Sequence, residues 1–342
     1  MRSDDVVETR VVVLVDQQDA EPVVRLALER GQQPAELVDP VDRGDDKVES
    51  HGHTLTPVPL VSVLMSVHND ARFVREAVDS VLRQTLPDLE LVVVDDASTD
   101  ATPEILSSVA DPRLELMRND ERSGLAASLN RGLEAAQGRY VARLDSDDVA
   151  LPDRLRLQVA RLEADPRIAV LGCAVRDLDE QGVAGRQHRS PLGPRAVRWL
   201  SLFSSPFFHP TVLVDREVLD GLRYDTEYLE SEDYDLWTRL LERAEGANLA
   251  DALVLKRVHV GQASQRRGDV QESFQRRVAL REIARVAPDV DAERAWRVGA
   301  RRPRGARREF LRLLAAFERT HGRDRAVRAA AFRALMSPRP RS

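Results

Sequence analysis

Cysteine and long apolar runs are scarce in this sequence, and their scarcity excludes several kinds of protein. The single cysteine, Cys173, has no partner for an internal disulfide and offers too few thiols for a cysteine-based zinc site. Because its neighbours in AVLGCAV are apolar, we expect a buried structural thiol rather than a nucleophile. The longest apolar run, near VPLVSVLMSV, is well short of the roughly 18 residues that a membrane-spanning helix needs. The acidic start, MRSDDVVETR, lacks the apolar stretch of a secretion signal, so we expect a cytoplasmic protein without a transmembrane segment.

Lysine is also rare, since all but two of the 51 basic residues are arginine. The net charge of −6 is uneven along the chain: residues 276–342 hold 19 basic and 7 acidic residues, whereas residues 1–58 hold 6 and 13. Within the basic tail, REFLRLLAAFERTHG predicts an amphipathic helix whose apolar stripe is Phe310, Leu313, Leu314 and Phe317. That stripe either packs on the rest of the protein or lies on an anionic membrane. In the second case the protein would be bound peripherally at the inner face of the membrane.

From Leu60 onward, short apolar runs alternate with helical patterns, which is typical of an α/β protein whose parallel strands are connected by helices. The pattern predicts strands at 61–67, 89–96, 113–117 and 139–145, with helices at 71–85, 103–110 and 125–136 between them. Thr102 and Pro103 are expected to form the cap and first turn of the second helix. Upstream, residues 10–38 fit a small strand–helix–strand unit followed by a polar linker, and beyond residue 268 the pattern is helical.

Acidic residues gather where two of the predicted strands end. VARLDSDDVALPDRL, residues 141–155, places three carboxylates within residues 145–148, and DDASTD follows the second strand. The first cluster could be a solvated turn, an N-cap group for a helix beginning near Leu151 and Pro152, or a site for a divalent cation. Ligands of open α/β sheets bind beyond the carboxyl ends of the strands, and Mg²⁺ or Mn²⁺ prefers hard oxygen ligands there. The sequence has no GxxxxGK[ST] and no GxGxxG after its first strand, which disfavours P-loop and dinucleotide folds.

Four motifs in this order and spacing resemble the family 2 glycosyltransferases of the GT-A fold. They are VSVLMSVHND, LELVVVDDASTDAT, SGLAASLNRGLEAAQGRYVARLDSDDVALPDRL and ESEDYDLWTRLLE, and they extend over residues 59–264. The resemblance implies a Rossmann-like mixed sheet flanked by helices. It also implies inverting transfer of a sugar from a nucleotide diphosphate sugar, with Mn²⁺ or Mg²⁺, to a carbohydrate or lipid-linked acceptor. We divide the chain into an N-terminal extension (1–58), a GT-A domain (59–265) and a basic helical region (266–342).

The same resemblance assigns roles to individual residues. Asp233 matches the general base that deprotonates the acceptor hydroxyl, and Asp147 of the DxD element matches the metal ligand. A weaker likeness places His259 at the metal or diphosphate, and His209 and Glu232 at the acceptor pocket. The residues implied to bind the nucleotide sugar are Val67, Asn69, Asp95, Asp96 and Asp145.

The sequence departs from the family pattern at two points. Ala97 stands where glycine is common, which should not block nucleotide binding, and the Gln-x-x-Arg-Trp element of processive synthases is absent. We therefore expect the addition of one sugar or a few, in the assembly of a surface polysaccharide or another glycoconjugate. Two alternatives are a sugar nucleotidyltransferase, which should carry a Gly-rich basic loop that SVHNDARF does not offer, and a noncatalytic binder of anions or nucleic acid through the arginine-rich tail. The acidic middle of the chain and its 4% aromatic content argue against nucleic acid.

Overall fold

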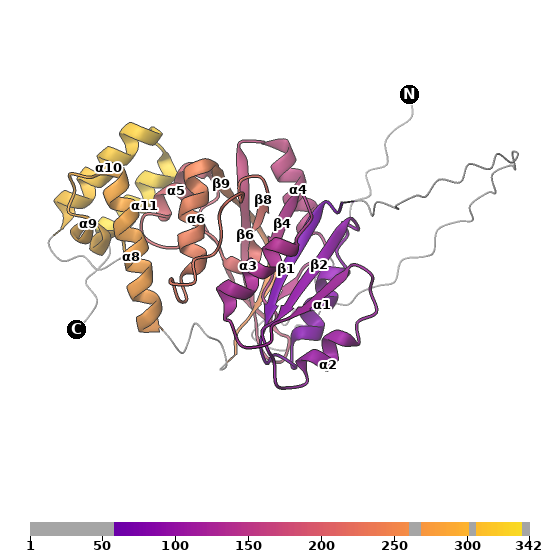
Figure 1. The fold of residues 1–342 in the computed structure, drawn as a ribbon. Coiled ribbons are helices and arrows are strands. Elements are labelled where there is room, and N and C mark those ends of the chain that lie inside the picture. Colours follow the sequence, from indigo (N-terminus) through magenta and orange to yellow (C-terminus); the bar gives the residue numbers. More distant parts are fainter. Residues whose placement is uncertain (1–57, 260–267, 301–305, 337–342) are drawn as a thin grey trace, which may run out of the picture. The chain divides into compact units, whose positions relative to one another are not determined.

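The computed structural model describes residues 58–259, 268–300 and 306–336 (Figure 1). The strand–helix–strand unit predicted for residues 10–38 lies outside these residues. The strands are β1 (Val61–Val67), β2 (Leu89–Asp95), β3 (Leu114–Arg118), β4 (Tyr140–Arg143), β5 (Val149–Ala150), β6 (Ile168–Leu178), β7 (Ala184–His188), β8 (Leu213–Asp215) and β9 (Glu245–Arg257). The helices are α1 (Val74–Leu82), α2 (Thr102–Ser107), α3 (Leu125–Ala135), α4 (Arg154–Ala164), α5 (Pro194–Leu200), the 3-10 helix η1 (His209–Thr211), α6 (Glu232–Arg243), α8 (Gly268–Val286), α9 (Ala292–Gly299), α10 (Arg307–His321) and α11 (Arg325–Met336).

The strands of the described residues form one mixed sheet in the order β3-β2-β1-β4-β8-β6-β9-β5, with β7 paired to β6. Strands β3, β2, β1 and β4 run parallel, as the alternation of strands and helices predicts. Beyond β4 the direction changes, because β8 is antiparallel to both β4 and β6. The parallel half therefore brings the carboxyl ends of β2, β1 and β4 together at one edge of the sheet.

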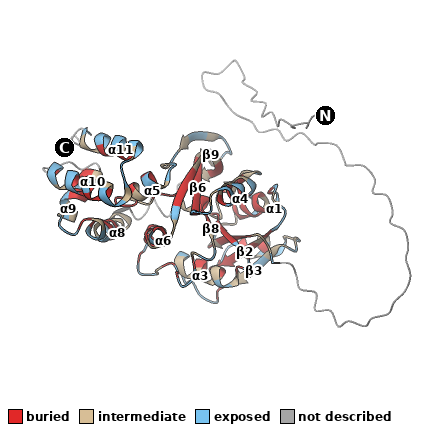
Figure 2. Cartoon of the chain, turned by 90° about the horizontal axis from the view of Figure 1, so that it is seen from above, coloured by how far each residue is buried: buried red, intermediate tan, exposed pale blue. Residues whose placement is uncertain are grey.

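Helices cover both faces of the sheet (Figure 2). The packing of strand β1 shows the reason. Its residues Val61, Val63, Met65 and Val67 pack with α1, α2 and α4 on one face, whereas Leu64 packs with α3 and α6 on the other. Successive strand residues point to opposite faces, so a strand covered on both sides must be apolar throughout, as VSVLMSV nearly is. The apolar side chains of α1 lie on its buried face, which includes Val74, Ala77, Val78 and Val81.

A separate apolar cluster joins the C-terminal helices to α5. Phe310, Leu313 and Phe317 of α10 are buried in it. The two phenylalanine rings contact Trp199 of α5, and Phe310 also contacts Phe203, which follows α5. The stripe on the basic helix therefore packs within the protein, which is the first of the two alternatives given above. None of the described helices combines the length and the apolar content needed to cross a membrane.

Two predictions about helix starts are wrong. Thr102 does not cap α2: it lies inside the helix, where its backbone N–H donates to Asp100 Oδ1 at 2.9 Å and its hydroxyl accepts from Asp70 N–H. The helix after the acidic cluster begins at Arg154, not near Leu151. The short strand β5 lies between the cluster and this helix and pairs with β9, so the cluster is not an N-cap group.

Candidate active site

The sheet edge described above carries most of the predicted site residues. Val67 at the end of β1 is paired with Asp95 at the end of β2, and Leu64 of β1 is paired with Arg143 at the end of β4. Asn69 and Asp96 follow directly after β1 and β2, and the acidic cluster follows β4. Parallel pairing alone therefore places these residues, which are distant in sequence, side by side.

The loops after β1 and β2 are bonded to each other. Asn69 has a φ of 55° and Ala97 a φ of 56°, both in the left-handed region. The Asn69 backbone N–H donates to Ser98 Oγ at 2.9 Å, and its side-chain carbonyl accepts from Thr99 N–H at 2.7 Å. Asparagine tolerates this conformation well, whereas alanine does so at a cost. The left-handed backbone at Ala97 gives a physical reason for glycine at that position.

Asp95 and Asp96 differ in how their carboxylates are used. Both oxygens of Asp96 accept hydrogen bonds, from the Asn119 side chain and from the backbone N–H groups of Ser123 and Gly124, at 2.7 to 2.8 Å. Although burial favours the neutral form, these hydrogen bonds lower the pKa of Asp96. Asp95 is also buried, but its Oδ2 has no hydrogen bond and lies 3.5 Å from the guanidinium of Arg118. Asp95 is thus the member of the pair with an oxygen that accepts no hydrogen bond from the described residues.

The acidic cluster after β4 is compact. One carboxylate oxygen from each of Asp145, Asp147 and Asp148 lies within 4.8 Å of the other two. Asp148 is buried and accepts the Arg257 backbone N–H at 2.8 Å through Oδ1, while its Oδ2 has no hydrogen bond. Burial raises the pKa of Asp148 well above its ordinary value, and the charges of Asp145 and Asp147 raise it further. Hard oxygen atoms at this spacing, one of them buried without a partner, fit a divalent cation.

The end of β9 supplies basic groups to this cluster. His259 Nε2 lies 3.1 Å from Asp147 Oδ2, and the Arg257 guanidinium donates to the Asp147 carbonyl oxygen at 2.8 Å. Burial raises the pKa of Asp147, the charge of Asp145 raises it further, and the hydrogen bond with His259 lowers it. Asp70, after β1, joins the group through Ser146, whose hydroxyl donates to Asp70 Oδ2 at 2.7 Å. Burial raises the pKa of Asp70 to about 6.

Asp233 and Glu232 lie in the first turn of α6. The Ser205 hydroxyl is 3.4 Å from Asp233 Oδ2, and burial raises the pKa of Asp233. Burial raises the pKa of Glu232 to about 7, and the neighbouring charge of Asp233 contributes to the rise. His209 Nε2 lies 3.0 Å from the Tyr224 hydroxyl in the same region, and burial lowers the pKa of this histidine well below its ordinary value.

Arg143 interacts electrostatically both with the acidic cluster after β4 and with the pair Glu232 and Asp233. It is 3% exposed, forms an ion pair with Asp145, and has no hydrogen-bond partner for Nε or Nη1. Its charge lowers the pKa of both Asp233 and Glu232 against the effect of burial, while the charge of Asp145 raises that of Asp233. The charges of Asp233 and Glu232 and those of the acidic cluster therefore influence one another.

Sequence reasoning missed four residues of this arrangement. Asp70 is the last residue of VSVLMSVHND, Ser146 lies inside the DSDD cluster, and Arg257 closely precedes His259. Arg143 is a charged residue inside an otherwise apolar strand, in YVARLD, and this was a signal that could have found it.

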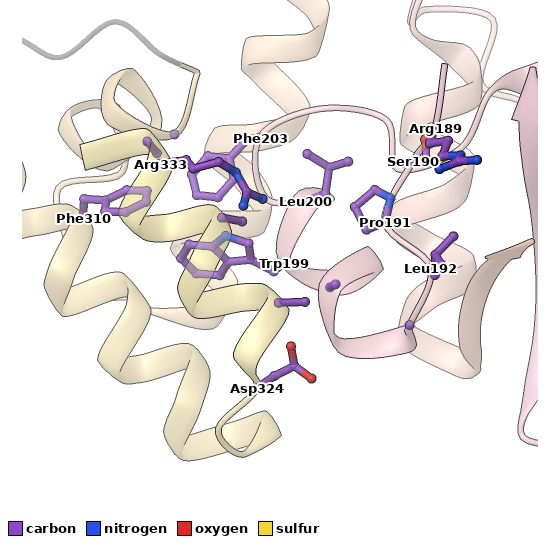
Figure 3. A pocket seen from close by; sticks show the side chains of 16 residues that line it. Arg189, Ser190, Pro191, Leu192, Trp199, Leu200, Phe203, Phe310, Asp324 and Arg333 are labelled. Atoms are coloured by element: carbon purple, nitrogen blue, oxygen red, sulfur yellow. The ribbon is translucent and has the colours of Figure 1, made fainter. Parts of the chain in front are cut away.

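A cavity of about 600 Å³ lies elsewhere, between α5 and the C-terminal helices (Figure 3). Its walls are largely apolar and include Trp199, Phe203 and Phe310, with Arg189 and Arg333 among the polar residues. None of the predicted site residues lines it. The chemistry of the acidic cluster, rather than the size of a cavity, identifies the candidate active site.

Comparison with known proteins decides the family. Residues 62–222 match the family model described as glycosyl transferase family 2. EpsE of Bacillus subtilis (strain 168), which is named as a glycosyltransferase, is 37% identical over 202 residues, which are 57% of this chain and 72% of EpsE. The chain belongs to glycosyl transferase family 2. The predicted family and enzyme class are therefore confirmed.

Two further known proteins are similar to this family 2 glycosyltransferase. The Escherichia coli protein WfaP, named UDP-Glc:alpha-D-GlcNAc-diphosphoundecaprenol beta-1,3-glucosyltransferase, is 29% identical over 208 residues, covering 60% of this chain and 80% of WfaP. The structure of the mannosyltransferase PcManGT from Pyrobaculum calidifontis, in complex with GDP-Man and Mn²⁺, matches with a TM-score of 0.53 and 23% identity, over 82% of this chain and 81% of that one. The structural match confirms the predicted GT-A fold.

Proposed function

We propose that this glycosyltransferase moves a sugar from a nucleotide diphosphate sugar to an acceptor hydroxyl with inversion at the anomeric carbon. The observation that carries the proposal is that Asp95 ends β2 and the acidic cluster follows β4, that the carboxyl ends of these strands lie at the same edge of the sheet, and that the charge of Asp145 in this cluster acts on Asp233. Inverting transfer needs a base on the acceptor side and stabilisation of the leaving diphosphate on the other side. The domain boundaries given above belong to the same proposal.

Asp147 and His259 would hold the divalent cation, together with a carboxylate oxygen of Asp145 or Asp148. The fit rests on three carboxylate oxygens within 4.8 Å and on the imidazole nitrogen 3.1 Å from Asp147. A bound Mn²⁺ or Mg²⁺ stabilises the negative charge of the departing nucleoside diphosphate. PcManGT, which shares the fold, binds Mn²⁺ with its donor, and this supports the same requirement here.

Asp233 would accept the proton of the acceptor hydroxyl as the oxygen attacks the anomeric carbon. Burial raises its pKa, which makes a carboxylate a stronger base, while the charge of Arg143 favours the ionised form that a base needs. Glu232 and His209 lie in the same region and would line the acceptor pocket.

Asp95 would contact the nucleotide directly through Oδ2, which accepts no hydrogen bond and lies beside Arg118. Asp96 would act through the loop that it holds, because its oxygens already accept three hydrogen bonds. Asp145 would bind the donor beside the cation, and Val67 and Asn69 would line the same pocket through their backbone.

The acceptor is a carbohydrate or a lipid-linked saccharide, and the pathway is assembly of a surface polysaccharide or glycoconjugate. The support is the likeness to WfaP, whose name gives a diphosphoundecaprenol-linked acceptor. Peripheral contact with a membrane at its inner face is part of this proposal. It would use the exposed arginines of the C-terminal region, because the apolar stripe of α10 is buried.

A thermal-shift panel tests the proposal. The full chain is heated with UDP, GDP, UDP-glucose, UDP-N-acetylglucosamine and GDP-mannose, each with and without Mn²⁺. We expect one nucleotide and its sugar to raise the melting temperature only when Mn²⁺ is present, because binding to the folded state alone stabilises it. Stabilisation that is independent of the metal, or no stabilisation by any member of the panel, would contradict it.

A further inference from the structure

Helix α8 packs along α6 and along the turn that precedes α6. The residues of α8 that make these contacts recur every three or four positions, as on one face of a helix. They are Gln271, Phe274, Val278, Arg281 and Arg285. Near its start, Val278 and Phe274 form a small apolar cluster with Tyr228 and Tyr234, so α8 contacts residues on both sides of the turn.

The turn before α6 is strained and is held from α8. Glu230 has a φ of 59°, a left-handed conformation that costs a residue with a side chain about 1 kcal/mol or more. The Gln271 side chain donates to the Glu230 carbonyl oxygen at 3.1 Å, and the Ser231 hydroxyl donates to the Gln271 carbonyl oxygen at 3.3 Å. Gln271 of α8 is therefore bonded to the backbone of Glu230 and to the side chain of Ser231, three and two positions before Asp233.

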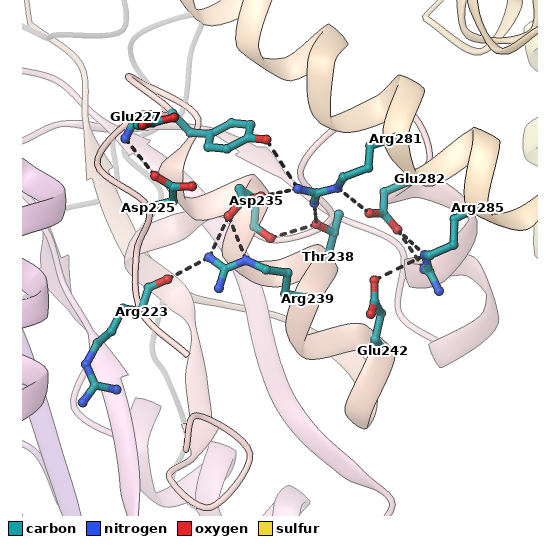
Figure 4. A network of polar contacts seen from close by, with 11 residues as sticks. Arg223, Asp225, Glu227, Asp235, Thr238, Arg239, Glu242, Arg281, Glu282 and Arg285 are labelled. Atoms are coloured by element: carbon teal, nitrogen blue, oxygen red, sulfur yellow. Dashed lines mark hydrogen bonds and ion pairs between the residues drawn. The ribbon is translucent and has the colours of Figure 1, made fainter. Parts of the chain in front are cut away.

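Arg281 holds the chain on the other side of Asp233 (Figure 4). Its guanidinium donates to Asp235 Oδ1 at 2.6 Å and to the Thr238 hydroxyl at 2.7 Å. The Asp235 side chain is 2% exposed, and Arg239 of the same helix binds its other oxygen at 2.6 Å. Separating a buried carboxylate from its ion-pair partners is costly, so the contact between Asp235 and Arg281 ties α6 firmly to α8.

We propose that Gln271 and Arg281 are positioning residues that hold Asp233 in place for catalysis. This inference rests on the proposed function, in which Asp233 is the base. Asp233 lies between Ser231 and Asp235, and α8 binds both. A displacement of about 1 Å at a reacting group can lower a rate about 100-fold, so loss of either contact reduces turnover without removing any group from the site.

The test compares Arg281→Met and Gln271→Leu with a matched control, Arg285→Met, in the full chain. Arg285 is on the same helix and in the same network, but it pairs with Glu242 and Glu282, toward the far end of α6 from Asp233. Hydrogen exchange is followed over residues 228–236. Turnover is measured with Mn²⁺ and the donor selected by the thermal-shift panel, and donor binding is measured by calorimetry.

We expect faster exchange over residues 228–236 in Arg281→Met and Gln271→Leu but not in Arg285→Met. We also expect kcat to fall about 10- to 100-fold in the first two variants, with donor affinity within about threefold of wild type. Arg281→Lys, which keeps the charge, should recover part of the loss. If Arg281→Met does not fold, Gln271→Leu alone decides, since it changes no charge.

Two results would overturn the inference: exchange over residues 228–236 that is the same in all variants, or equal turnover in Arg285→Met and the two test variants. A failure of the proposed function has a different signature. In that case the wild type neither binds a nucleotide with Mn²⁺ nor turns over any donor of the panel, while the exchange data still decide whether α8 holds the turn.

Discussion

Replacing Glu232 by glutamine should stabilise the protein at alkaline pH and leave it unchanged at acid pH. Glu232 is 7% exposed, and burial together with the charge of Asp233 raises its pKa from 4.5 to about 7. Between these values the folded protein holds a proton that the unfolded chain has released, so stability falls as the pH rises. Each pH unit between the two pKa values, 4.5 and about 7, lowers the free energy of unfolding by about 1.36 kcal/mol. The total loss is therefore about 3 kcal/mol and is complete above about pH 7.

Glutamine resembles the protonated acid at every pH and removes this loss. Urea unfolding without divalent cations at about pH 5 and about pH 8.5 should show Glu232→Gln more stable than wild type by about 3 kcal/mol at the higher pH, and within about 1 kcal/mol at the lower one. Glu242→Gln, at an exposed position near the other end of α6, is the control and should follow the wild type. A Glu232→Gln protein whose stability declines with pH as steeply as the wild type would refute the argument from burial.

Four other predictions test the site and its surroundings. Asp147→Asn should abolish Mn²⁺-dependent nucleotide binding, and calorimetry with unchanged affinity would remove Asp147 from the cation site. Asp233→Asn should retain donor binding and lose transfer by about 1,000-fold, so near-normal turnover would exclude it as the base. Ala97→Gly should stabilise the fold by about 0.5–1 kcal/mol in urea unfolding, because the left-handed strain at φ 56° exceeds the entropic cost of glycine; a destabilised variant would contradict this. The basic C-terminal region should bind anionic vesicles at low salt, and failure to co-sediment with them would leave packing as the role of α10.

The parallel half of the fold could be predicted from sequence because each element there has a strong local signal. VSVLMSV is apolar on both faces and forms β1 over the predicted residues, 61–67. β5, with only Val149 and Ala150, was missed because two residues carry no periodic pattern, and its pairing with β9 spans about 100 positions. The start of α2 was misplaced because Thr102 is a residue type that favours the cap position, whereas its hydroxyl is used in a tertiary contact with Asp70 and the helix already includes it.

The sequence predicted those parts of the candidate site whose residues lie within one motif. Asp145, Asp147 and Asp148 are adjacent in sequence, so their meeting at the end of β4 follows from local structure. The contact of His259 with Asp147 joins residues 112 positions apart, and the resemblance rather than any pattern pointed to it. The contact between Arg281 and Asp235 lay beyond sequence reasoning, because α8 presents arginines on several faces and only packing selects the one that meets α6.

The buried thiol of Cys173 makes the protein convenient for labelling experiments. Its side chain is 0% exposed, and burial raises its pKa to about 11, so maleimide reagents, which need an accessible thiolate, should not modify it in the folded protein. A cysteine introduced at exposed Gln181, in the turn between β6 and β7, would then be the only position to take up a dye. Fluorescence from that dye could follow donor and cation binding without replacement of the native residue.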